Sequence, residues 1–64
     1  MNKIQWYEIF VSTNDGTQTV MTCDTAKEAR YYRKKFTANK LPNEEFFIDK
    51  WEDTENPHII GEIN

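Results

Sequence analysis

The sequence predicts an α+β protein in which two β-hairpins are joined by one helix, in the order ββαββ. Three observations predict this fold. Residues 24–40 show the period of an amphipathic helix, four other segments are rich in β-branched and aromatic residues, and turn signals separate those segments in pairs. Two antiparallel hairpins joined in this way form a two-layer sandwich, a four-stranded antiparallel sheet with the helix packed on one face.

The first expected strand, Ile4–Thr13, carries apolar residues on both of its faces. Its two alternating sets are Tyr7, Ile9 and Val11, and Trp6, Glu8 and Phe10. Because both sets are largely apolar, we expect this strand to lie in the centre of the sheet, with each face at least partly covered.

Residues 13–17 predict the turn of the first hairpin, in one of two forms. Asp15-Gly16 can form a two-residue type I′ turn, or Asn14-Asp15 can be the centre of a type I turn with Gly16 as a left-handed bulge residue. The choice fixes the register of the two strands, and a slip of one residue exchanges their faces.

We favour the second form, because it pairs Val11 with Thr19 and Ile9 with Met21. This pairing gathers one apolar face, made of Tyr7, Ile9, Val11, Met21 and Cys23. The second strand is then Gln18–Cys23, with Val20 on the same side as Trp6 and Phe10.

Residues 24–40 predict the helix, which begins with a capping box made by Thr25 and Glu28. The inner side is expected to carry Ala26, Ala29, Tyr32 and Phe36, and its two alanines let the helix lie close to the sheet. The outer side is expected to carry Lys27, Arg30, Tyr31 and Lys34. Residues 39–42 end the helix, because the residue before a proline avoids helical angles and Asn39 tolerates a left-handed cap.

Glu45–Asp53 and His58–Ile63 are the expected third and fourth strands, separated by a turn over residues 54–57. The third strand alternates Phe46, Ile48 and Lys50 with Phe47, Asp49 and Trp51. Gly61 is a weak point or bulge in the fourth strand.

The length of 64 residues predicts a single small domain, residues 1–64, with a thin hydrophobic core. One cysteine and one histidine provide neither a disulfide nor a Cys/His zinc set. Cys23 is expected to be a small core residue, and His58 a surface residue. No glycine-rich phosphate loop, calcium loop or catalytic constellation is present, so we expect no enzyme, no cofactor and no metal site.

The chain has no apolar run of signal-peptide or membrane-spanning length, so we expect a cytoplasmic protein without a membrane partner.

Charge is distributed unevenly along the chain. Residues 25–40 carry six basic side chains against Glu28 alone, a net charge of +5, while the remainder carries −8 and the whole chain −3. Six acids fall within residues 44–55, and we interpret them as charge that keeps edge strands from pairing. The functional alternative is that they bind a basic partner, in the manner of a nucleic-acid mimic.

The helix can cover one face of the sheet, and the sequence contains no second element for the other face. We expect an aromatic patch there, made of Trp6, Phe10, Val20, Phe47 and Trp51. The sequence therefore predicts a non-enzymatic interaction module, an adaptor or stoichiometric inhibitor, that forms a homodimer through this patch and binds a further protein. This profile resembles the small accessory proteins of phages and mobile elements.

The alternative function is nucleic-acid or nucleotide binding by Lys27, Arg30, Tyr31 and Lys34, with Tyr31 stacking on bases. The acidic remainder of the chain argues against it, because a phosphate backbone would be repelled from most of the surface.

Overall fold

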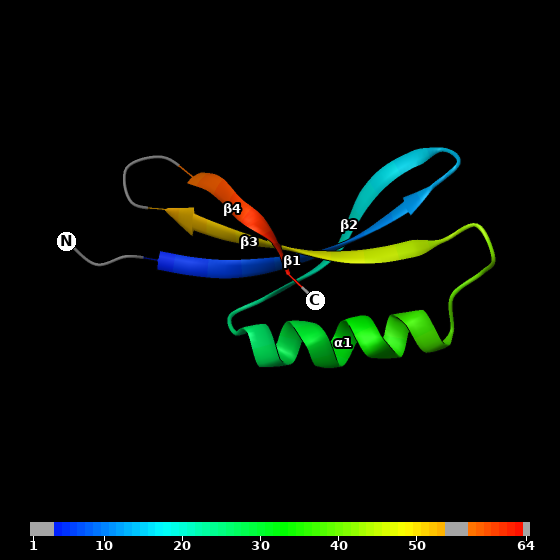
Figure 1. The fold of residues 1–64 in the computed structure, drawn as a ribbon, viewed down its shortest axis with the longest axis horizontal. Helices are drawn as coiled ribbons and strands as arrows, with labels where there is room; N and C mark the ends of the chain where they lie inside the picture. The colour runs from blue at the N-terminus through cyan, green and yellow to red at the C-terminus, as the bar shows by residue number, and fades with distance from the viewer. Residues whose placement is uncertain (1–3, 54–56, 64) are drawn as a thin grey trace.

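The computed structural model has the predicted two-layer architecture and describes residues 4–53 and 57–63 (Figure 1). Its elements are β1 (Ile4–Thr13), β2 (Gly16–Cys23), α1 (Ala26–Ala38), β3 (Glu45–Asp53) and β4 (Pro57–Ile63). The turn expected over residues 54–57 lies outside the described residues except for Pro57. The fold class is thus confirmed, and the observed bounds of β1 and β3 are those expected from the sequence.

The sheet has the strand order β2-β1-β3-β4, and every neighbouring pair is antiparallel. The two hairpins are joined through the pairing of β1 with β3, which places Ile9 opposite Ile48 and Trp6 opposite Trp51. The expected central position of the first strand is confirmed, because β1 has a partner on each side.

The hydrophobic core lies between α1 and the sheet. The side chains of Ile9, Ile48 and Ala29 are fully buried, and Cys23 is 6% exposed. Half-buried residues pack around this centre, namely Tyr7, Met21, Tyr32, Phe36, Phe46 and Ile63. The buried Ala29 lets α1 approach the sheet closely, and the rings of Phe36 and Phe46 stack with their centroids 5.3 Å apart. The inner side of the helix is therefore the one predicted from the helical period.

The first hairpin differs from the expected register near its turn. Val11 pairs with Gln18 rather than with Thr19, because only Asn14 and Asp15 separate the paired residues Thr13 and Gly16. The extra residue is accommodated farther along β2, in a bulge at Val20, after which Ile9 pairs with Met21 as expected. The sequence placed the extra residue at Gly16, whereas the strand accommodates it at Val20.

Both ends of α1 are capped by side chains. At the start, Thr25 Oγ1 accepts a hydrogen bond of 3.2 Å from the Glu28 backbone N–H and donates one of 3.2 Å to Glu28 Oε1. At the end, Asn39 has a φ of −113° and does not take the expected left-handed conformation. Its side-chain Nδ2 instead donates to the Lys35 carbonyl at 3.1 Å, which satisfies one of the last carbonyls of the helix.

The helix covers one face of the sheet, and no described element covers the other (Figure 1). We call the uncovered side the open face. With 13 residues, α1 is too short to cross a bilayer, and the described part of the chain has no other helix that could do so.

Candidate interaction surface

The strand registers assign the open face residue by residue, because directly paired residues share a face and successive residues alternate. Five rows of paired side chains cross the sheet on this face, and the three central rows form the candidate surface. One row contains Trp6, Trp51 and Ile59, the next Glu8, Asp49 and Glu62, and the last Phe10 and Phe47. We call the middle one the acid row. Thr19 and Thr22 of β2 continue this face beside Phe10 and Glu8.

Two stacked aromatic pairs form the apolar part of the open face. The rings of Trp6 and Trp51 lie with centroids 5.8 Å apart and planes 8° from parallel. Those of Phe10 and Phe47 lie 5.4 Å apart with planes inclined by 26°. All four side chains are half-buried, and Ile59 beside Trp51 is 50% exposed. The aromatic surface predicted on the second face is therefore present for these four residues.

The acid row lies between the two aromatic pairs. Glu8, Asp49 and Glu62 stand on three neighbouring strands, so their Cα atoms span two strand spacings, or about 10 Å. The described strand residues assigned to this face include no lysine, arginine or histidine. All charged residues among them are acidic, namely Glu8, Glu45, Asp49, Asp53 and Glu62.

The Glu8 carboxylate is oriented by neighbours on both sides. The Trp51 indole Nε1 donates a hydrogen bond of 2.8 Å to Glu8 Oε1. The Thr19 hydroxyl on β2 donates to Glu8 Oε2. The two bonds attach one carboxylate to the strands on either side of β1, so Glu8 is held in the sheet surface between the rings.

Asp49 stands between two other carboxylates. Partial burial raises the pKa of its carboxyl above the ordinary value of 3.8, and the charges of Glu62 and Glu8 raise it further. Like charges directly opposite each other on neighbouring strands are destabilising. Repulsion between the carboxylates of this row therefore lowers the stability of the fold.

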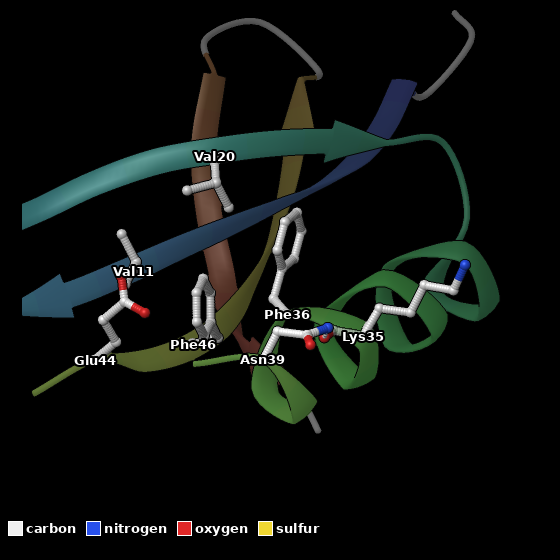
Figure 2. A pocket seen from close by; sticks show the side chains of 7 residues that line it. All are labelled: Val11, Val20, Lys35, Phe36, Asn39, Glu44 and Phe46. Atoms are coloured by element: carbon white, nitrogen blue, oxygen red, sulfur yellow. Dashed lines mark hydrogen bonds between the residues drawn. The ribbon is translucent and has the colours of Figure 1, made fainter. Parts of the chain in front are cut away.

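Val20 is not part of the open face, contrary to the expectation from the sequence. It lies on the helix side, where it lines a hollow of about 460 Å³ together with Val11, Phe36 and Phe46. Figure 2 shows Val20, Phe36 and Phe46 pointing into this space from β2, α1 and β3. The bulge explains the difference, because it turns Val20 and Met21, two consecutive residues, toward the same side of the sheet.

The outer side of α1 carries the second predicted site. Lys27, Arg30, Tyr31 and Lys34 are all exposed there, as expected. Arg30 and Lys34 line a hollow of about 480 Å³ with Arg33, Thr37 and Ala38, whereas Lys27 and Tyr31 are not part of it. The Tyr31 and Tyr32 rings meet edge to face with centroids 5.1 Å apart, and Lys35 Nζ lies 4.8 Å from the centroid of the Tyr31 ring. One face of the ring is thus occupied by a cation, which leaves less of it for stacking on a base.

Cys23 and His58 lie in different parts of the fold. Cys23 is a free, buried thiol at the end of β2, as expected for a core residue. His58 is exposed on β4, opposite the buried Glu52 of β3. The described residues contain no group of three or more histidine, cysteine or acidic side chains placed to hold one metal ion, and this includes the acid row.

Comparisons of the chain with protein-family models, curated proteins and solved structures gave no match. The functional argument therefore depends on the geometry of the surface itself.

The acid row is the part of this surface that sequence reasoning missed. Glu8 alternates with Trp6 and Phe10, and Asp49 with Phe47 and Trp51, so the alternation predicts that both acids lie on the second face. The sequence does not show that they are direct neighbours, because this follows from the register of β1 against β3. The one antiparallel register that aligns Trp6 with Trp51 also pairs Glu8 with Asp49, so the tryptophan pair is the signal that could have found the acid row.

Proposed function

We propose that this protein is a non-enzymatic interaction module, an adaptor or stoichiometric inhibitor, that binds another protein through its open face. The observation that carries this proposal is the pair of stacked aromatic contacts on a sheet face that no described element covers. Aromatic residues dominate the binding energy of protein interfaces, and extended apolar patches on small proteins mark such interfaces.

The fold supports this proposal, because a chain of this size has a thin core and gains stability when a partner covers rings that are only half-buried. We place the protein in the cytoplasm, where its free thiol Cys23 would stay reduced. The aromatic pairs would accept either of two partners. One is a second copy of the chain, which the sequence leads us to expect, and the other is a different protein.

Photo-crosslinking in the native host tests the proposal. The photoreactive residue p-benzoylphenylalanine replaces Phe47 on the open face or, as the matched control, the exposed Tyr31 on the outer side of α1. We expect protein adducts from position 47 and none from position 31. The absence of adducts at position 47 would refute the proposal.

The mass of the adduct identifies the occupant. An adduct of twice the chain mass of 7.7 kDa indicates a second copy, and any other mass indicates a different protein. Size-exclusion chromatography with light scattering at high micromolar concentration provides an independent check. A homodimer through the open face should dissociate in the Trp51→Ala variant, and a monomeric wild-type protein excludes it.

The second candidate function is anion or nucleic-acid binding by the outer side of α1. The hollow lined by Arg30, Arg33 and Lys34 favours it. A fluorescence titration with single- and double-stranded probes tests it. Affinity that falls steeply with salt and is lost in Lys34→Gln would support this function, and no affinity at low salt would exclude it.

A further inference from the structure

The open face combines two kinds of binding group in one small area. The acid row provides three carboxylates on neighbouring strands, and a stacked aromatic pair lies on either side of it. The strand residues two positions before and after the row carry the rings, so the aromatic pairs are about 13 Å apart along the strands. This separation is between Cα atoms, and the Trp51 indole reaches as far as Glu8, so the space between the rings suits an extended chain rather than a helix, which is about 10–12 Å across.

This surface is complementary in charge to a cationic partner. The described strand residues on this face contribute carboxylates and no cation, and Trp51 and Thr19 hold Glu8 in place by hydrogen bonds to its two oxygens. Among cationic side chains, arginine fits best, because its planar guanidinium binds carboxylates with two parallel hydrogen bonds and stacks on aromatic rings. On the open face, carboxylates that accept these hydrogen bonds and rings that stack on the guanidinium lie within the reach of one arginine side chain.

We infer that the open face binds an arginine-bearing segment of a different protein, laid along the acid row between the two aromatic pairs. This inference rests on the proposed function and names the chemical class of the partner.

Charge separates this occupant from a second copy of the chain. A symmetric contact centred on the acid row brings the acid rows of two copies together, and like charges across an interface are strongly unfavourable. The basic outer side of α1 could lie on the open face of another copy, but such a head-to-tail contact repeats from copy to copy and builds a ring or an open filament. A basic segment of another protein satisfies the acid row without either consequence.

Peptide binding to the full chain tests this inference. The probe is a fluorescein-labelled peptide of nine arginines, and a peptide of nine lysines has the same charge without the planar group. Fluorescence anisotropy measures both affinities at about 0.15 M salt, where long-range attraction is largely screened. We expect the arginine peptide to bind at least about fivefold more tightly than the lysine peptide, because only guanidinium groups pair bidentately and stack.

Two double variants of equal net charge locate the site. Asp49→Asn with Glu62→Gln removes two charges of the acid row, and Asp15→Asn with Asp24→Asn removes one charge from the hairpin turn and one from the residue before the helix N-cap. We expect the first variant to weaken binding of the arginine peptide about tenfold or more, and the second by less than about twofold. Circular dichroism confirms that both variants are folded.

Three outcomes of the peptide measurements would overturn the inference. They are no binding of the arginine peptide by the wild-type chain, equal losses in the two double variants, and equal affinity for the two peptides. The proposed function is tested separately, because crosslinks from position 47 to another protein would persist if only the arginine chemistry were wrong. A 15.4 kDa homodimer adduct, about twice the 7.7 kDa chain, would keep the proposed function and overturn this inference.

Discussion

The indole of Trp51 donates a hydrogen bond of 2.8 Å to the carboxylate of Glu8, across the two central strands of the open face. The same indole stacks on Trp6, so one ring serves both the apolar and the acidic part of this surface. Because both strands belong to the central β1–β3 pairing, this contact also fixes how the two hairpins align.

The Trp51→Phe variant should lose the hydrogen bond to Glu8 while keeping an aromatic ring at this position. A hydrogen bond to a charged group contributes about 1.5–3 kcal/mol when buried, and the half-buried setting of Glu8 reduces this to about 1–2 kcal/mol. Urea unfolding measures the loss. Trp6→Phe is the control, because it makes the same change of ring and leaves the Trp51–Glu8 bond in place. Equal losses in the two variants would show that the bond contributes nothing to stability.

The Asp49→Asn variant should be more stable than the wild type at pH 7. The folded state raises the pKa of Asp49, so its ionised form destabilises the fold above that pKa, and the effect disappears as the pH falls below the unfolded value of 3.8. The variant removes like-charge contacts with Glu8 and Glu62, each costing about 0.2–1 kcal/mol.

Thermal unfolding of Asp49→Asn between pH 7 and pH 3 checks this prediction. A gain of 1 kcal/mol corresponds to about 4–8 °C in Tm for a domain of this size. The difference from the wild type should be largest at pH 7 and should shrink as the pH falls toward 3.8. A difference that does not depend on pH would contradict the electrostatic cause.

The two glycines should respond in opposite directions to replacement by alanine. Gly16 has a φ of +122°, a conformation that other residues rarely adopt, so Gly16→Ala should destabilise by about 1 kcal/mol or more. Gly61 lies in β4 without a positive φ, and an added Cβ there meets no atom within 4 Å. Gly61→Ala should therefore be neutral or stabilising by about 0.4–1 kcal/mol. Chemical denaturation of both variants tests the pair, and a stable Gly16→Ala would contradict the assigned turn.

The Cys23 thiol should react slowly in the folded protein. Burial raises its pKa above the ordinary value of 9.0, and the charges of Glu28 and Asp24 add to this, so little of the nucleophilic thiolate is present at neutral pH. If reaction requires unfolding, a stability of about 3–5 kcal/mol slows modification by Ellman's reagent by about a hundredfold to a few thousandfold relative to the unfolded chain. An exposed cysteine in Thr17→Cys, made in a Cys23→Ala background, is the control for an accessible thiol.

Much of the fold was predictable from local patterns. The capping box at Thr25, the period of α1 and the alternation of β3 each depend on residues close together in the sequence. The position of the bulge in β2 could not be predicted from local patterns, because Gly16 and Val20 are both able to accommodate the extra residue. The choice between them depends on how β2 packs on α1, where Val20 faces Phe36 across the hollow.

The candidate site was predictable in its aromatic part and not in its acidic part. Alternation placed Trp6, Phe10, Phe47 and Trp51 on one face, as the structure does. The alignment of Glu8 with Asp49, and of Asp49 with Glu62, depends on two registers between strands. Such registers follow from the packing of the whole sheet. The clustering of acids on this surface could therefore be derived only from the structure.

The placement of acids on the open face and of bases on the outer side of α1 gives the molecule an electric dipole directed through its two layers. On a positively charged support, such as an amine-coated sensor chip or an anion-exchange resin, the protein should lie with its sheet against the support and its helix toward the solution. Adsorption of this kind would hide the surface that we propose as its binding site. Attachment through the helix, for example at a cysteine introduced in place of Lys27, would leave that surface accessible.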